Sequence, residues 1–266
     1  MSYPRHLPAL LLTALCASVP AFCQPIPLSP SQLDQLVSRI ALYPDPLLAQ
    51  ILTASTDWSE IPAAADWANQ HSYLTGDALA AAIKEDNLAW APTVLALLPF
   101  PSVLEMMAQD PAWTQQLGNA VLTQRAEVMD AVQRMRRKAR EFGYLQSNPN
   151  VNVVDTGGYI EILPVTPGLI YVPTYDPFVV FGPPRPGFVV SGAIRFGPGI
   201  TIGAAFAPWG WASPGFVWSN HTILIDRAPW TRHWENRAVY AHPYAHPWVR
   251  ALGPVVEHHE IRSRRR

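Results

Sequence analysis

Between residues 31 and 146 the apolar positions recur three and four residues apart, which places them on one face of an α-helix. Most of these segments open with proline, a residue suited to the first helical turn. Ser29 followed by Pro30 and Gln32 predicts a helix start with a capping box. We predict further helices from Asp45, near residues 59–70, 77–86, 92–98 and 101–109, and a longest one from Asp110-Pro111 to about Phe142.

The helical region contains a possible internal duplication at an offset of 55 residues. IALYPDP at residues 40–46 aligns with LALLPFP at residues 95–101, and Trp58 then aligns with Trp113. Each Pro-x-Pro turn would break one helix and start the next. A chance recurrence of such turns between apolar helices is the competing interpretation.

From residue 147 onward the pattern changes to short runs of β-branched and aromatic residues between turn signals, which indicates strands. Residues 151–154 and 159–163 flank Asp155-Thr156-Gly157-Gly158 and predict a hairpin. Further strands are predicted at residues 169–172 and 178–181, separated by Pro173 and Asp176-Pro177.

The apolar segment from Phe188 to Ala207 has the length of a membrane span, but Arg195 and Pro198 interrupt it. We predict a hairpin that turns at Gly197-Pro198-Gly199, with a closely packed helix as the alternative. Together these patterns predict an α+β fold. It comprises a helical domain at 31–146, a β-rich Gly/Pro/Trp domain at 147–248 and a flexible, disordered basic tail at 249–266.

Residues 1–23 have the features of a secretory signal peptide. Arg5 and His6 form a short basic start, and residues 7–19 form an apolar stretch too short to span a bilayer. Cleavage after Cys23 or after Ala21 fits the small-residue pattern. We therefore expect an exported protein, periplasmic or extracellular. Lipidation of Cys23 is disfavoured because the bulky Phe22 precedes it.

Composition excludes several classes of protein. The chain of 266 residues has a formal net charge of -1, which argues against a general nucleic-acid binder. Apolar residues make up 49%, which argues against intrinsic disorder. The two cysteines are Cys16 and Cys23, so cleavage after Cys23 leaves neither a disulfide framework nor a cysteine nucleophile.

Charge is distributed unevenly along the helical domain. Residues 31–110 are strongly acidic, whereas the end of the long predicted helix carries five basic residues: Arg134, Arg136, Arg137, Lys138 and Arg140. We expect these to complement the helix dipole and to pair with the acidic helices. A patch for anionic lipid or polymer is the alternative.

Four motifs resemble those of the bacterial domain-of-unknown-function family 3300. They are IALYPDPLLAQIL at 40–52, TGDALAAA at 75–82, VMDAVQRMR at 128–136 and IYVPTYDP at 170–177. The resemblance covers about residues 31–205 and implies an exported bacterial protein. It implies no activity, and it transfers no functional residue or cofactor.

Six of the ten tryptophans lie between residues 209 and 248. Among them Trp209, Trp211 and Trp218 are candidate binding residues, since exposed rings stack on the sugars of a glycan or anchor a protein partner. Core filling in a region with few aliphatic side chains is the competing interpretation.

Other candidate chemistry is sparse. His242 and His246 are weak metal candidates, although Pro243 and Pro247 disfavour the helix that would align them. The nearest carboxylate cluster is Asp45, Asp57, Glu60 and Asp66, of which Asp45 and Asp57 are explained by helix capping. We assign no catalytic residue, cofactor or dedicated metal site.

We therefore expect a non-enzymatic interaction or structural protein of the cell envelope, with an envelope protein or a glycan as its partner. A hydrolase acting on cell-wall or secreted polymer is the first alternative. The second is a peripheral membrane protein that contacts the bilayer through residues 188–207 without spanning it.

Overall fold

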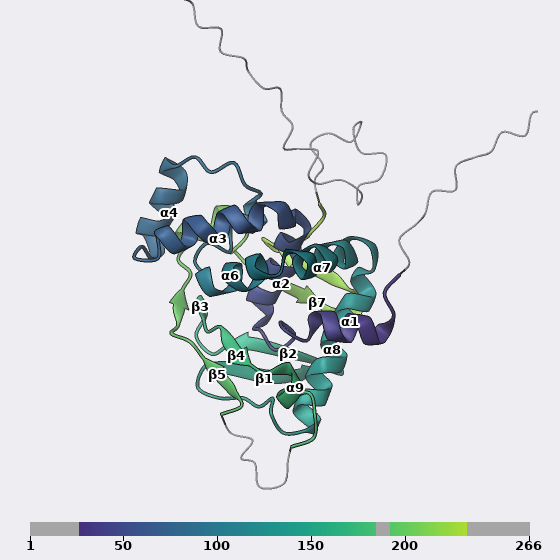
Figure 1. The fold of residues 1–266 in the computed structure, drawn as a ribbon. Coiled ribbons are helices and arrows are strands. Elements are labelled where there is room, and N and C mark those ends of the chain that lie inside the picture. Colours follow the sequence, from purple (N-terminus) through teal and green to yellow (C-terminus); the bar gives the residue numbers. More distant parts are fainter. Residues whose placement is uncertain (1–26, 185–191, 233–266) are drawn as a thin grey trace, which may run out of the picture.

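The computed structural model describes residues 27–184 and 192–232, and the predicted signal peptide and basic tail lie outside these ranges. Helices occupy the first half and short strands the second, so the α+β prediction is confirmed (Figure 1). The helices pack together in one part of the molecule, and the strands β1, β2, β4 and β5 lie against the end of that part.

The helices begin where the proline pattern predicts. At α1 (Pro30–Val37), Ser29 and Gln32 form the predicted capping box: Ser29 Oγ accepts from Gln32 N, and Gln32 Oε1 accepts from Ser29 N at 2.8 Å. A proline lies in the first turn of most later helices. These elements are α2 (Asp45–Ala54), η1 (Ser55–Glu60), α3 (Ile61–Gln70), α4 (Gly76–Glu85), α5 (Pro92–Leu95) and α6 (Pro101–Gln109).

The longest predicted helix is two helices, α7 (Pro111–Thr123) and α8 (Arg125–Glu141), so a single helix from 111 to 142 is wrong. The break is at Gln124, whose φ of -137° and ψ of 42° are not helical. Its side chain bonds both backbone groups of Leu28, accepting from N at 2.8 Å and donating to O at 3.1 Å. The apolar period continues through the break because both helices bury one face in the same core.

The two Pro-x-Pro segments adopt similar turns. Tyr43 N donates to Ile40 O at 3.0 Å, and at the equivalent position Leu98 N donates to Leu95 O at 3.2 Å. The helices α2 and α6 follow these turns. Beyond them the two segments diverge, because Trp58 lies in η1 whereas Trp113 lies in α7. The local turn therefore recurs, and duplication of a whole hairpin stays a prediction.

The predicted hairpin at residue 157 is confirmed. β1 (Val151–Thr156) pairs antiparallel with β2 (Tyr159–Pro164) through Gly157 and Gly158. Their φ angles of 62° and 88° lie in the left-handed region that glycine adopts without strain, as a tight two-residue turn requires.

The hairpin predicted at Gly197-Pro198-Gly199 is wrong. β5 (Ile194–Phe196) pairs with β4 (Pro173–Tyr175), and β6 (Ile200–Thr201) pairs with β3 (Leu169–Ile170). Residues 197–199 are thus a bulge opposite residues 171–172, and Pro198 has no N–H to continue the ladder. A helix through this segment is also wrong, since η2 (Ala204–Trp209) is its only helical part among the residues described.

The strand predicted at 178–181 is wrong as well, because residues 177–180 form the short helix α9 (Pro177–Val180). Asp176 caps it by accepting from Phe178 N at 2.9 Å. The Asp-Pro pair that starts a helix at Asp45 and at Asp110 starts one here too, and this outweighs the β-branched residues that follow.

The described chain ends in a small antiparallel sheet in the order β7–β8–β9, which contacts α2. Its strands are β7 (Gly215–Val217), β8 (Thr222–Ile225) and β9 (Ala228–Pro229), and the short helix η3 (Trp218–Asn220) connects β7 to β8. Among the described residues no helix is both long and apolar enough to cross a membrane.

The principal hydrophobic core does not stop at the boundary near residue 147. The side chains of Phe206, Trp218 and Ile223 are buried in the same cluster as those of α2, α6, α7 and α8. A smaller cluster joins Leu42 and Ala139 to the β1–β2 hairpin. The boundary therefore separates two kinds of secondary structure, and the core continues across it.

Gly118 in α7 permits the close approach of η1. A Cβ there would lie 2.1 Å from Ser55 O and 2.6 Å from Ser55 C, both backbone atoms. We expect Gly118→Ala to destabilise the fold by about 1–3 kcal/mol through overpacking. Urea unfolding measures this. Gly215→Ala is the matched control, because nothing lies within 4 Å of its Cβ position. Equal stability of the two variants would contradict this packing.

Candidate functional site

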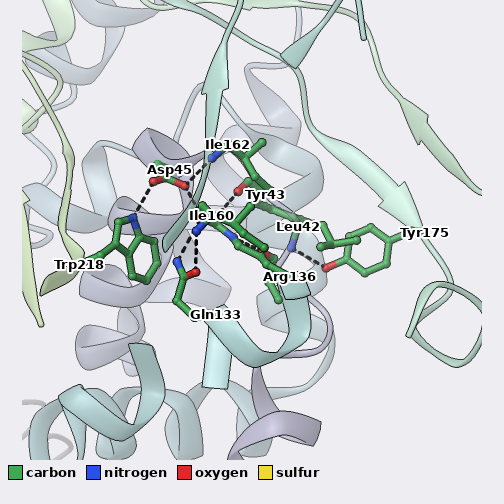
Figure 2. A network of polar contacts seen from close by, with 10 residues as sticks. Leu42, Tyr43, Asp45, Gln133, Arg136, Ile160, Ile162, Tyr175 and Trp218 are labelled. Atoms are coloured by element: carbon green, nitrogen blue, oxygen red, sulfur yellow. Dashed lines mark hydrogen bonds and ion pairs between the residues drawn. The ribbon is translucent and has the colours of Figure 1, made fainter. Parts of the chain in front are cut away.

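Arg136 is a fully buried charge at the junction between the helices and the β1–β2 hairpin. Its side chain is 0% exposed, and Nη1 lies 2.7 Å from Asp45 Oδ1, whose side chain is 5% exposed (Figure 2). In sequence, Arg136 falls four residues after Val132 and eight after Val128, on the stripe that α8 buries. That spacing was the available signal that this arginine differs from its basic neighbours.

The other Arg136 donors bind backbone carbonyls. Nε donates to Ala41 O at 2.8 Å, Nη2 to Tyr43 O at 3.1 Å and Nη1 to Ile160 O at 2.8 Å. Ala41 and Tyr43 lie in the turn before α2, where the carbonyls lack helical partners. The guanidinium also lies 5.1 Å from the centroid of the Trp218 ring. One side chain thus joins α8, the turn before α2, β2 and η3.

Asp45 completes the junction from the other side. Its Oδ1 also accepts from Ile162 N at 3.2 Å, and Oδ2 accepts from Trp218 Nε1 at 3.0 Å. The helix-capping role expected for Asp45 is wrong, since α2 has no side-chain cap. The Asp45 carboxylate instead bonds three groups that are distant in sequence, so its role is to hold separate elements together.

Two further side chains strengthen this junction. Gln133 pairs with Ile160 as a neighbouring strand would, accepting from its N at 2.8 Å and donating to its O at 3.0 Å. Tyr175 donates its hydroxyl to Ser38 O at 2.9 Å and accepts from Leu42 N. Burial raises the pKa of Tyr43 to about 12 and raises the pKa of Tyr175 well above its ordinary value.

The remaining basic residues of α8 form surface pairs. Arg134 lies 2.7 Å from Asp34 in α1, and Arg140 lies 2.7 Å from Asp155 in β1. The hydrogen bond from Arg140 is the main cause that lowers the pKa of Asp155. The expected pairing with acidic residues is therefore present, while Arg137 and Lys138 are exposed.

The three tryptophans considered for binding pack into the core. Trp218 and Trp209 are 4% and 9% exposed, and Trp211 is half-buried with its Nε1 donating to Ala96 O at 2.8 Å. Each also contacts a phenylalanine ring: Trp209 with Phe206, Trp211 with Phe100, and Trp218 with Phe216. This is the core-filling arrangement, and it leaves no open ring surface at Trp218.

His242 and His246 lie outside the described residues. Within the described ranges no cluster of three or more His, Cys, Asp or Glu side chains is arranged to hold a metal ion. His221, from the same histidine-rich end of the chain, lies with Nε2 2.9 Å from Asp130 Oδ1 in α8.

The carboxylates considered for catalysis have separate structural partners. Asp57 pairs with Arg232 at 2.9 Å, and Glu60 accepts from Ala91 N at 2.7 Å, while Asp66 is exposed on α3. None of them lines the cavity of about 430 Å³ beneath residues 143–151, whose walls include Tyr144, Asn148 and Phe196.

The fold and its buried junction define a class: an α+β protein in which a helical layer is joined to β-hairpins through a sealed ion pair. The chain belongs to the family described as "Protein of unknown function (DUF3300)", whose model matches residues 29–248. This confirms the resemblance noted from the sequence motifs.

A relative in Escherichia coli (strain K12) carries the name "Uncharacterized protein YacH". It is 33% identical over 186 residues, which are 58% of this chain and 30% of that protein. The match thus spans less than a third of the relative's length. No solved structure matches this chain.

Arg136 tests the importance of the junction. We expect Arg136→Met to destabilise the protein by about 3–5 kcal/mol, because it leaves the buried Asp45 carboxylate without its countercharge. The control Arg140→Ala removes an exposed pair, with side chains 44% and 43% exposed, and should change the free energy of unfolding far less, because solvent screens an exposed ion pair. Chemical denaturation measures both.

Trp218→Phe is a milder companion variant should Arg136→Met not fold, since it keeps a ring but deletes the donor to Asp45. This variant should lower the free energy of unfolding by about 1–3 kcal/mol. Stability of Arg136→Met equal to that of Arg140→Ala would show that the buried pair contributes nothing.

Glu161 gives the fold a distinct pH dependence. Desolvation, and then repulsion from Asp45, raise its pKa in the folded state, so the fold favours the neutral carboxyl. This stabilisation is full below the unfolded pKa and is lost as pH rises through the folded pKa. Glu161→Gln should therefore be more stable than the wild type at pH 7, with the difference vanishing near pH 3. A pH series of urea midpoints tests this, and an equal difference at both pH values would contradict it.

Proposed function

We propose that this protein is exported and serves in the cell envelope as a non-catalytic interaction or structural protein. The proposal of a non-catalytic role rests on the burial of the junction between Asp45 and Arg136. Asp45 and Arg136 each have several converging partners, yet their atoms bond each other, backbone groups and Trp218 out of reach of solvent. Such a site organises the fold, and function then belongs to the surface.

Export is supported by the leader-like first 23 residues and by a core that needs no disulfide. Cys16 and Cys23 both lie in that segment, and the packing described above consists of aliphatic, aromatic and ion-pair contacts. A protein built in this way is compatible with an oxidising compartment.

An envelope protein or a glycan is the partner class that we propose. The chain has a formal net charge of -1, and its basic helix end is largely paired with acidic residues. At this helix end little positive field remains for polyanions such as nucleic acids. Recognition would then depend on surface shape, aromatic rings and hydrogen bonds.

Processing of the leader tests export directly. The chain, produced in Escherichia coli with a C-terminal tag, should be released by osmotic shock with its first residue at Gln24 or Phe22, measured by intact mass. Leu11→Arg breaks the apolar stretch and should leave the full-length chain, beginning at Met1, in the cytoplasm.

The matched control is Arg264→Leu, which changes charge outside the leader and should be processed normally. Recovery of the wild type as an unprocessed cytoplasmic chain would overturn the proposed export.

A further inference from the structure

Three aromatic rings form a stack at the corner between α3 and α4. The Trp67 and His71 rings are 3.9 Å apart with an interplanar angle of 19°, and the His71 and Tyr73 rings are 6.2 Å apart at 27°. Trp67 lies in α3, and the other two follow at its C-terminal end. We call Trp67, His71 and Tyr73 the aromatic ladder.

The fold holds the inner two rings in place. Trp67 Nε1 donates to Asp86 Oδ2 at 2.7 Å, which ties α3 to the residue that ends α4. His71 Nδ1 lies 2.9 Å from Trp67 O, so the imidazole is fixed over the last turn of α3. Fixed rings lose little conformational freedom on binding, which favours affinity.

The outer ring has no comparable role in the core. Tyr73 is 76% exposed, whereas Trp67 and His71 are half-buried. An aromatic ring that packs with one neighbour and otherwise faces water contributes little to stability, but it offers a flat apolar surface with a hydroxyl at its edge. The ladder is thus a rigid base with an open outer face.

The charge around the ladder restricts the ligand. Residues 61–90 carry four acidic side chains, Asp66, Asp77, Glu85 and Asp86, all of them exposed, and the single base Lys84. This negative field disfavours polyanions. It suits a ligand with an apolar ring face and hydroxyl donors, because carboxylates accept hydrogen bonds from hydroxyls.

A sugar ring has this combination. Its C–H face is apolar and stacks on an aromatic ring, while its hydroxyls point outward around the edge. Asp86 accepts the hydrogen bond from the Trp67 indole, so its carboxylate lies directly beside the stack.

We propose that the aromatic ladder is the binding site for an uncharged glycan, with Tyr73 as the stacking surface and Asp86 as an acceptor for sugar hydroxyls. This inference rests on the proposed envelope function and names its partner class and surface. It uses the ladder in place of Trp209 and Trp218, whose rings are buried in the core.

Affinity electrophoresis of the full mature chain tests the site. Native gels would contain hydroxyethylcellulose, a mixed-linkage β-glucan or glycol chitin, and gels with alginate would supply the polyanion comparison. We expect at least one neutral polymer to retard the wild type, alginate not to, and Tyr73→Ala to bind about tenfold more weakly.

Phe178→Ala is the matched control. Phe178 is 94% exposed and lies on α9, at the other end of the molecule from α4, so its loss removes an exposed aromatic ring from elsewhere (Figure 1). It should bind as the wild type does. Both variants should keep the wild-type Tm, which separates loss of a binding surface from loss of structure.

Retardation by none of the neutral polymers, or equal retardation of the wild type and Tyr73→Ala, would overturn the glycan site. So would a protein partner that is lost with Tyr73→Ala while no glycan binds. In each of these cases, correct processing of the leader would still support the proposed export. Glycan binding by a chain that stays in the cytoplasm would overturn the export and would still support the glycan site.

Discussion

The buried ion pair between Arg136 and Asp45 is the interaction on which the arrangement of the two parts depends. A guanidinium that is 0% exposed is tolerated only when its donors are satisfied, and here they bond groups of α2, of the turn before α2 and of β2, while the Trp218 ring of η3 lies against it. These elements are therefore held in one register. Displacing any of them leaves a charge or a carbonyl unpaired in the core.

This constraint explains why the strand region is ordered despite very short strands. β3 and β6 contribute two residues each, far fewer than an isolated sheet needs. Ile170 of β3 is buried in the principal core, and Tyr175 in β4 and Gln133, which bonds β2, attach the neighbouring strands to the helical part. The strands lie against the helical part, and the aromatic ladder stands at the end of α3, with Tyr73 76% exposed.

The same logic separates the aromatic residues into two groups. Trp209, Trp211 and Trp218 looked like a binding cluster because they are close in sequence, but proximity in sequence does not measure exposure. The ladder is formed by residues that attract little notice in the sequence, a tryptophan, a histidine and a tyrosine over seven positions. Only the end of α3 turns their rings parallel.

By itself the sequence determined the helical starts, the capping box at Ser29 and the Gly157–Gly158 hairpin, because these depend on neighbours within a few residues. It also determined the family, which motifs along the chain identify. Tertiary structure decided the break at Gln124, the bulge at residues 197–199 and the role of Asp45. In each case the deciding partner is far away: Leu28 for Gln124, residues 171–172 for the bulge, and Arg136 for Asp45. The local sequence pattern indicates only which secondary structure a segment prefers. A buried polar group, in contrast, adopts the conformation that its distant partner requires.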